Sequence, residues 1–471
     1  MKRKRRKSLK LQIKKFIGDR SFYKGVLAIA LPLMIQNAVT NFVNLLDNIM
    51  VGALNTESMS GVSIVNQFIF IFNITVFGAI AGAGIYTSQF HGRGDTEGVR
   101  GAFRLKIIFN LIIGALGVLV FSLFGDSLIS TFLHEGAEGN LELTRSLGNE
   151  YLSYAIVGLV PFALAQAYSS TLRETGETVI PMISSIVSVV TNCLLNALLI
   201  FGLLGFPALG VVGAAIATTT SRFAELAVLA VWTHTHSDKY PFIKGALRSP
   251  RVSLPLFKGV IVKSLPMVAN ELFWSLAVTM RNQCYSTRGL DVVAATTIAA
   301  TIINLLTVAY MAVGISVGIV VGRELGAGEV ERAKDTNRKM LALAFMIGVV
   351  IGVVQAICAP IFPLVYNTTE SVRSMATSLM FIAALFTPFN AVAMASYFTL
   401  RAGGRVFTAA LFDSVYAWGA IMSVLLALTH LTDVGIIVLF TVAALVEALK
   451  CPLGVIVLSK VKWARQLVIK Q

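Results

Sequence analysis

The sequence predicts an all-α membrane protein in which twelve transmembrane helices form two pseudo-symmetric six-helix bundles. Three observations support this fold class: long apolar runs, basic residues confined to one side of those runs, and a segment that occurs once in each half of the chain. Of the 471 residues, 56% are hydrophobic and only 13% are charged. A soluble domain cannot bury that much apolar surface, so lipid must cover part of it.

The apolar runs are long enough to cross a bilayer as helices, which takes about 20 residues each. Short polar or glycine-containing segments separate them. The twelve predicted spans are residues 25–50, 58–89, 103–125, 151–172, 177–203, 209–233, 256–286, 292–321, 339–363, 374–399, 404–429 and 433–459.

The net charge of +15 is distributed unevenly along the chain. With an even number of spans and both termini in the cytoplasm, the inside segments contain 34 of the 39 Lys and Arg residues. This is the positive-inside pattern, and it predicts a multi-pass protein of the plasma or inner membrane. The first 24 residues carry eleven of the basic residues. They suit anionic lipid headgroups, and no aromatic-interleaved basic fold accompanies them, so we expect no nucleic-acid partner.

Residues 32–106 and 266–340 look like two copies of one segment. Pro32 and Pro266 begin the copies, and the glycine-containing loops that end them keep the same offset of 234 positions. A duplicated apolar chain predicts two membrane bundles facing each other across a pathway, which makes transport the first hypothesis. The predicted parts are a basic cytoplasmic segment 1–24, an N-terminal lobe 25–236, a cytoplasmic linker 237–255, a C-terminal lobe 256–460 and a cytoplasmic tail 461–471.

The first span carries an unusual polar face. On an ideal helix of 100° per residue, seven polar residues fall within one arc of 140°. They are Gln36, Asn37, Thr40, Asn41, Asn44, Asp47 and Asn48. Lipid would not tolerate such a face, so it must contact protein or water. For each asparagine a structural hydrogen bond between helices explains the pattern as well as a functional role does.

Asp47 is the strongest functional candidate. An ionised carboxylate at membrane depth costs about 2.5–3.5 kcal/mol and is rare without a partner or a cavity. A buried carboxylate that binds either a proton or a cationic ligand, each displacing the other, is the physical basis of exchange. We therefore expect Asp47 to bind a coupling ion or substrate, with Gln36 and Asn44 on the same face.

Further candidates lie in other spans. Asn192 and Asn196 are four residues apart on one face of the fifth span and are expected to neighbour Asp47. In the second lobe the candidates are Glu271 on the seventh span, Asn390 on the tenth and Asp413 on the eleventh. Two oppositely charged pairs, at 222/225 and 447/450, are spaced to neutralise each other within a helix.

No sequence motif indicates an enzyme. Walker, nucleophile-elbow, HExxH and paired Cys-His patterns are absent from the sequence, so we expect no catalytic residue, no metal site and no cofactor. ATP hydrolysis within this chain is therefore not the predicted energy source. An ion gradient is the remaining common one.

Several segments together form a recognisable pattern. They are Leu31-Pro32 through Asp47-Asn48 to Gly52, Ser88-Gln89 with Gly92-x-Gly94-Asp95, Leu172-Arg173-x-x-Gly176, Asn192-x-x-x-Asn196, and Gly213 to Thr218. This pattern resembles the multidrug and toxic compound extrusion (MATE) family, and the resemblance is spread over both halves and covers nearly the whole chain.

The resemblance implies twelve helices in two six-helix lobes around a central cavity. In one branch of the family an Asp matching Asp47 is protonated or helps to bind the coupling ion. That branch often has an Asn and an Asp on the fifth helix, and here Asn196 stands at the position of the Asp. Another branch uses a Glu on the seventh helix and an Asp on the tenth. Glu271 lies about one turn before that Glu, and Asn390 stands where the Asp would be. These departures leave open which lobe couples and which ion is used.

We therefore expect a monomeric secondary antiporter that exports organic, often cationic or lipophilic, compounds in exchange for H⁺ or Na⁺ by alternating access. The alternative is a lipid-linked saccharide flippase of a related fold. Such proteins need intramembrane cations for phosphate, and the predicted spans offer few, chiefly Arg222 and Arg281. A channel or receptor without a coupled cycle is a third class, which the two-lobe repeat disfavours.

Overall fold

The structure, a computed structural model, describes residues 16–133 and 140–468, apart from the side chains of Val43, Asn44, Leu45 and Asn48. Within these ranges all regular secondary structure is helical. Twelve helical spans in the described chain are long and apolar enough to cross a membrane, which confirms the predicted fold class. The chain is a multi-pass membrane protein.

The first three helices of each half begin in register. Their starts are 234 positions apart in each pair, which matches the offset seen in the sequence. The pairs are α2 (Arg20–Gly52) with α9 (Leu254–Ser286), α3 (Thr56–Arg93) with α10 (Leu290–Gly326), and α4 (Thr96–Ser130) with α11 (Val330–Cys358). Pro32 and Pro266 lie inside α2 and α9, and each removes one backbone donor from its helix.

The described chain forms two compact units. The N-terminal unit contains residues 35–87 and 95–268, and the C-terminal unit contains the described residues up to 34, residues 88–94 and those from 269 onward. Helices α2, α3 and α9 (Leu254–Ser286) therefore each contribute to both units. The lobe boundaries predicted from the sequence stay a prediction.

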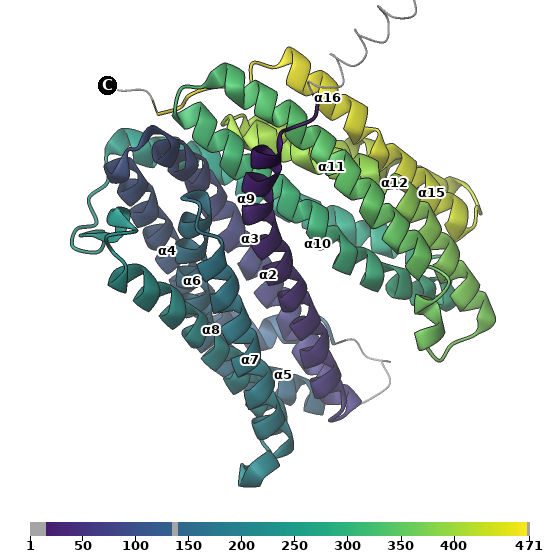
Figure 1. The fold of residues 1–471 in the computed structure, drawn as a ribbon. Coiled ribbons are helices and arrows are strands. Elements are labelled where there is room, and N and C mark those ends of the chain that lie inside the picture. Colours follow the sequence, from purple (N-terminus) through teal and green to yellow (C-terminus); the bar gives the residue numbers. More distant parts are fainter. Residues whose placement is uncertain (1–15, 134–139, 469–471) are drawn as a thin grey trace, which may run out of the picture. The chain divides into compact units, whose positions relative to one another are not determined.

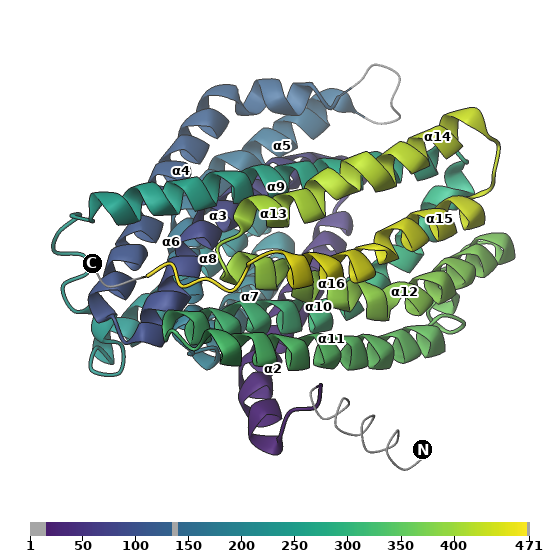
Figure 2. The same ribbon diagram turned by 90° about the horizontal axis from the view of Figure 1, so that it is seen from above.

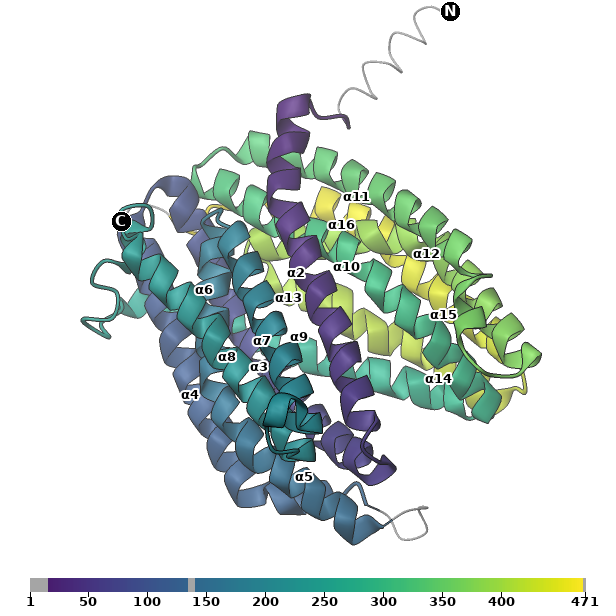
Figure 3. The ribbon, with the colours of Figure 1, turned by 60° about the horizontal axis from the view of Figure 1, so that its bottom comes forward.

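The N-terminal unit is built from α4, α5 (Leu141–Ala155), α6 (Leu159–Glu174), α7 (Val179–Phe201) and α8 (Gly210–Thr235), with most of α2 and α3. One 3₁₀ turn, Ile156–Gly158, joins α5 to α6, so that the two form a single span. Helix α7 packs along α8, and α6 packs against α4 and α8 (Figure 3). Between these helices lies an apolar core that includes Val65, Ile129, Tyr151 and Ala215.

The C-terminal unit is centred on α12 (Glu370–Ala402), which packs against α10, α11, α15 (Ile436–Ala448) and α16 (Lys450–Lys460) (Figure 2). Two glycines on α11 allow close packing against α12. A Cβ atom on Gly348 would lie 2.6 Å from the Cα atom of Pro388, and one on Gly352 would lie 2.6 Å from the carbonyl oxygen of Ala384. A side chain at either glycine would force these helices apart.

The eleventh span is irregular. It consists of α13 (Val406–Ala410), two π-helical segments and α14 (Ser423–Leu431). The π-helical segments are Leu411–Val415 and Ala417–Met422. Short π-helical segments within α-helices are frequent at functional sites, because the extra residue redirects the side chains around it.

The loop between α8 and α9 is folded against α4 within the N-terminal unit. Arg104 donates hydrogen bonds to the carbonyl oxygens of Ala246, Gly245 and Arg251 at 2.8, 2.9 and 3.1 Å. Arg100 donates to the Phe242 carbonyl at 3.1 Å. The segment predicted as an inter-lobe linker is therefore bound along much of its length to one helix.

Residues 461–468, here called the C-terminal strap, pack within the C-terminal unit beside the end of α3 (Figure 1). Gln89 donates to the Arg465 carbonyl at 3.2 Å and accepts from the Leu467 amide at 2.7 Å. Arg93 donates to the Val468 carbonyl at 2.7 Å. Gln89 also donates to the Ala402 carbonyl at 3.0 Å, and a Cβ atom on Gly92 would collide with the Arg323 carbonyl oxygen. Together these contacts hold residues 88–94 in the C-terminal unit, although the rest of α3 belongs to the other.

Candidate ion-coupling sites

Asp47 lies on α2 against α7, next to Asn192 and Asn196. Asn196 donates from Nδ2 to Asp47 Oδ1 at 2.5 Å. With its amide nitrogen turned toward Asp47, Asn192 donates to Oδ1 at 2.7 Å and accepts from Thr218 Oγ1 at 3.2 Å. Both asparagines are buried. The structure thus brings these candidates together, as the four-residue spacing on one helix face predicts.

The Asp47 carboxylate has neutral hydrogen-bond donors and no bound basic side chain. Arg222 on α8 acts on it electrostatically, but the ion pair of Arg222 is with Glu225, at 3.4 Å. Among the described residues, no Lys or Arg nitrogen lies within 4.0 Å of the Asp47 carboxylate. Asn196 Oδ1 is buried without a hydrogen-bond partner in the described chain. The negative charge of Asp47 is therefore not compensated by an ion pair within the described chain, and a proton or a small cation would balance it.

Gln36 lies on the same face of α2 but belongs to a different contact. It is eleven residues before Asp47, about 16 Å away along the helix axis. Its Nε2 donates to Ser185 Oγ at 2.8 Å, and its Oε1 accepts from Arg173 at 3.5 Å. Gln36 therefore ties α2 to α7 nearer the start of the helix. The side chain of Asn44 lies outside the described ones.

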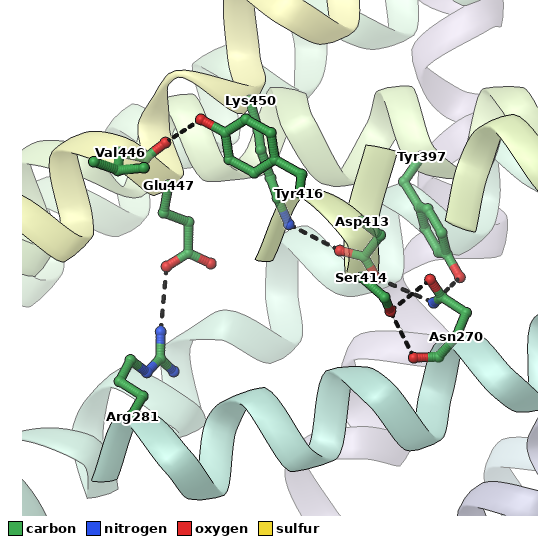
Figure 4. Close-up of polar contacts among 9 residues, drawn as sticks. All are labelled: Asn270, Arg281, Tyr397, Asp413, Ser414, Tyr416, Val446, Glu447 and Lys450. Atoms are coloured by element: carbon green, nitrogen blue, oxygen red, sulfur yellow. Dashed lines mark hydrogen bonds and ion pairs between the residues drawn. The ribbon is translucent and has the colours of Figure 1, made fainter. Parts of the chain in front are cut away.

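A second polar cluster lies in the C-terminal unit, where α9, α12, the eleventh span and α16 meet (Figure 4). Asn270 donates from Nδ2 to Asp413 Oδ2 at 3.1 Å and to the Tyr397 hydroxyl at 3.1 Å. Ser414 donates to Asn270 Oδ1 at 2.8 Å. Lys450 completes the cluster, with its Nζ 2.9 Å from Asp413 Oδ1.

Glu271 belongs to the same cluster through α12. It is hydrogen-bonded to Tyr397, and the charges of Arg401 and Asp413 both act on it. The Arg401 guanidinium lies over the ring of Tyr397, 5.3 Å from its centre. Glu271 and Asp413, two of the predicted acids, are therefore brought together with two basic residues. Asn390 is not joined to them by a hydrogen bond within the described chain, and its Oδ1 is buried without a donor there.

Of the two ion pairs predicted within single helices, the structure contains one and replaces the other by two different pairs. Arg222 and Glu225 pair on α8, as predicted. Pairing between Glu447 and Lys450 is wrong, because Glu447 pairs with Arg281 on α9 at 3.3 Å, and Lys450 pairs with Asp413 (Figure 4).

The reason for the difference is a break between α15 and α16 at Leu449. Pro452 has no N–H to donate to the carbonyl of Ala448, four residues earlier, so the regular helix cannot run through this point. After the break the side chain of Lys450 points toward the eleventh span, away from Glu447 (Figure 4).

Sequence reasoning missed Lys450, Tyr397 and Ser414 as members of the second cluster. Pro452 was a visible signal for a helix break next to Lys450, but it does not say which helix the lysine then faces. For the described residues, no group of three or more His, Cys, Asp or Glu side chains is placed to hold a metal ion. The first cluster thus consists of a carboxylate, amides and a hydroxyl, and the second adds the basic side chains of Lys450 and Arg401.

Comparison with known proteins gives one consistent result. The MatE family model matches residues 32–198 and 266–444. The probable multidrug resistance protein NorM of Thermotoga maritima is 25% identical over 417 residues, which cover 88% of this chain and 87% of that protein. The probable multidrug resistance protein YoeA of Bacillus subtilis is 25% identical over 420 residues, covering 88% and 89%.

A solved structure supports the same fold. It is described as the outward-facing conformation of a multidrug resistance MATE family transporter of the MOP superfamily. It aligns with a TM-score of 0.84 at 22% identity and covers 95% of this chain and 97% of that one.

Proposed function

Because the chain belongs to the MatE family of membrane transporters, we propose that it is a secondary antiporter that exports small organic compounds in exchange for H⁺ or Na⁺. The relatives named as multidrug resistance proteins support a broad organic substrate class, often cationic or lipophilic. The internal repeat supports alternating access, in which one site opens in turn to each side of the membrane.

The observation that carries this proposal is the state of Asp47. Its carboxylate has amide donors from Asn192 and Asn196 and, among the described side chains, no basic group at ion-pair distance. An ionised carboxylate in a membrane helix costs about 2.5–3.5 kcal/mol, and binding a proton or a cation removes that cost. One carboxylate cannot hold two cations in the same place, so a bound ion and a cationic substrate exclude each other.

This exclusion is what couples the two fluxes. If the binding site can change its exposure only when Asp47 is occupied, each change carries either the ion or the substrate. The ion then moves inward on one passage and the substrate moves outward on the other. Each exchanged proton contributes about 1.4 kcal/mol per pH unit, which supports about a tenfold substrate gradient. Glu271 is the second candidate for this role, since the charge of Arg401 acts on it but it forms no ion pair within the described chain.

The family of lipid-linked saccharide flippases remains the alternative, and two contacts speak against it. Arg222 and Arg281, the arginines considered for phosphate, each face an acid of their own unit, at 3.4 and 3.3 Å. An arginine already neutralised by a carboxylate is a poor phosphate ligand, because the acid repels the incoming anion.

The test is transport by protein reconstituted into vesicles loaded with a fluorescent organic cation. We expect a pH step or a Na⁺ step to drive its efflux through the wild type. The variant Asp47→Asn should reduce gradient-driven efflux by about tenfold or more, because an amide cannot exchange a cation for the substrate. Glu271→Gln is measured in parallel to find out whether the second acid contributes.

The matched control is Asp433→Asn, which removes an exposed acid between α14 and α15 and should transport like the wild type. Thermal unfolding in detergent verifies that each variant is folded. If folded Asp47→Asn and Glu271→Gln proteins both transport at the wild-type rate, the assignment of the coupling site is wrong. If the wild type itself responds to neither gradient, antiport is wrong.

A further inference from the structure

Asp47 and Asp413, acidic residues of different units, have different kinds of partners. In the N-terminal unit Asp47 has amide donors, whereas in the C-terminal unit both oxygens of Asp413 are occupied, one by Lys450 at 2.9 Å and the other by Asn270 at 3.1 Å. Lys450 is only 6% exposed, so its charge has been removed from solvent. A lysine this deeply buried is rare unless its ammonium group is paired.

The Lys450 ammonium group occupies the place that a free cation would take. It is a compact monovalent charge with three N–H donors on a flexible chain. One face of it meets Asp413, and the ring of Tyr416 lies 5.7 Å from Nζ, which adds a cation–π contact. The carboxylate and the aromatic ring together make a site for a monovalent cation or a primary amine.

The position of Lys450 is fixed by its backbone. The break caused by Pro452 turns the lysine toward the eleventh span, and Gly454 brings α16 close to its neighbours. A Cβ atom on Gly454 would lie 2.8 Å from Ser396 Oγ and 3.2 Å from the Phe412 ring. The π-helical segment Leu411–Val415 presents Asp413 to the same point. Helices α9, α12 and α16 and the eleventh span thus meet around one ion pair, which argues against an incidental contact.

We propose that Lys450 is a built-in cation that fills the monovalent-cation site of Asp413, so that this carboxylate takes no ion from solution during transport. This inference rests on the proposed antiport and deepens it, because it leaves Asp47, with Glu271, to exchange the coupling ion. A cation attached to the chain by four methylene groups has a high effective concentration at its site, so free Na⁺ or H⁺ competes poorly with it.

The experiment removes the tethered cation and asks whether an external one replaces it. Wild type, K450A and the double variant K450A/D413N are purified in detergent, and binding of radiolabelled methylammonium and Na⁺ is measured by equilibrium dialysis. Methylammonium reproduces the end of the deleted side chain. We expect K450A to bind one more cation per chain than the wild type, and K450A/D413N to lose that extra site. The control K460A removes an exposed lysine of the same helix and should match the wild type.

A second readout follows Asp413 directly. Hydrophobic carbodiimides modify membrane carboxyl groups in their neutral form, and mass spectrometry locates the product. Asp413 should resist modification in the wild type, where Lys450 and Asn270 occupy its two oxygens, and react about tenfold faster or more in K450A, where one oxygen has lost its partner. Added methylammonium should restore resistance in K450A.

The inference is overturned if K450A gains no cation site, or if wild-type Asp413 reacts with carbodiimide as fast as in K450A. If K450A fails to fold, labelling of the wild type decides the question. Modification of wild-type Asp413 that is suppressed by added Na⁺ would show that this carboxylate takes up ions from solution, which would overturn the inference. These outcomes are independent of Asp47→Asn transport, so a failure of the antiport proposal and a failure of this one are distinguishable.

Discussion

Single residues show how far local spacing can predict a site. Asn192 and Asn196 share a helix face by spacing alone, and the arc of polar residues on α2 points Asp47 toward protein, so their meeting could be predicted. The partner of Lys450 could not. Its helical neighbour Glu447 satisfies the three-residue rule, yet the break at Leu449 sends the two side chains to different helices. Spacing rules hold only where the helix is continuous.

Glu177 offers a residue-scale prediction outside the membrane spans. Burial raises the pKa of Glu177, but hydrogen bonds from Lys239 at 2.6 Å and Tyr240 at 2.8 Å outweigh it, so the pKa falls below its ordinary value of 4.5. The hydrogen bond to Glu177 also raises the pKa of Lys239, from 10.5 to about 12. These contacts help to hold the loop between α8 and α9 on the N-terminal unit.

The sign of the pH dependence follows from the two shifts. The lowered pKa of Glu177 stabilises the docked loop fully above pH 4.5, and this contribution is lost as the pH falls through the lowered pKa. The raised pKa of Lys239 stabilises it fully below pH 10.5, and this contribution is lost as the pH rises through about 12. A spin label at Leu247→Cys should therefore be least mobile between these limits. The variant Glu177→Gln should make its mobility independent of pH at the acid end; an unchanged acid transition would contradict the prediction.

At the scale of elements, all twelve spans could be located from the sequence, but their internal form could not. Length and hydropathy identify a span because lipid requires about 20 apolar residues. Length and hydropathy do not depend on which backbone groups are hydrogen-bonded, so they do not predict the 3₁₀ turn at Ile156–Gly158 or the π-helical segments of the eleventh span. Prolines and packing against neighbours decide such details, and only the first of these is visible in the sequence.

The contact between α11 and α12 gives a prediction for an element. Replacing Gly348 or Gly352 by Ala places a methyl group within 2.6 Å of α12 atoms, so one of the helices must shift. Overpacking of this kind costs about 1–3 kcal/mol. Thermal unfolding in detergent should show a lower midpoint for both variants.

The matched control for these variants is Gly25→Ala on α2, where an added Cβ meets nothing within 4 Å. It should leave the midpoint unchanged or raise it slightly, because Ala is preferred over Gly in a helix by about 0.5–1 kcal/mol. Equal effects at all three positions would mean that the close approach of α11 and α12 contributes nothing to stability.

For the whole molecule, the repeat and the composition were enough to predict the class of protein. The offset of 234 positions reappears in three pairs of helix starts, because duplicated sequences fold into the same elements. The grouping of residues 88–94 with the C-terminal unit could not be predicted, since it involves contacts with distant residues, such as the hydrogen bonds from Gln89 to the carbonyls of Ala402 and Arg465, 313 and 376 positions away. Long-range contacts leave no periodic trace in a sequence.

Membrane topology is the prediction for the whole chain. Leu204, in the turn between α7 and α8, is 91% exposed, and Leu247, in the loop between α8 and α9, is 58% exposed. With both termini in the cytoplasm, these positions lie on opposite sides of the membrane. In a background without the four native cysteines, an impermeant maleimide should label Leu204→Cys in intact cells and Leu247→Cys only after permeabilisation. The reverse order would invert the topology.

The C-terminal strap also affects the order in which the protein can be completed. The end of α3 leaves the ribosome early, but the backbone groups that hydrogen-bond to Gln89 are synthesised much later, at Ala402 313 positions on and in the strap 376 and 378 positions on. Until then its amide must remain hydrated or pair elsewhere. A premature stop codon just after α16 would therefore spare the described helices and still remove the carbonyls of Arg465 and Val468 that bind Gln89 and Arg93, so the end of α3 would be held by fewer hydrogen bonds.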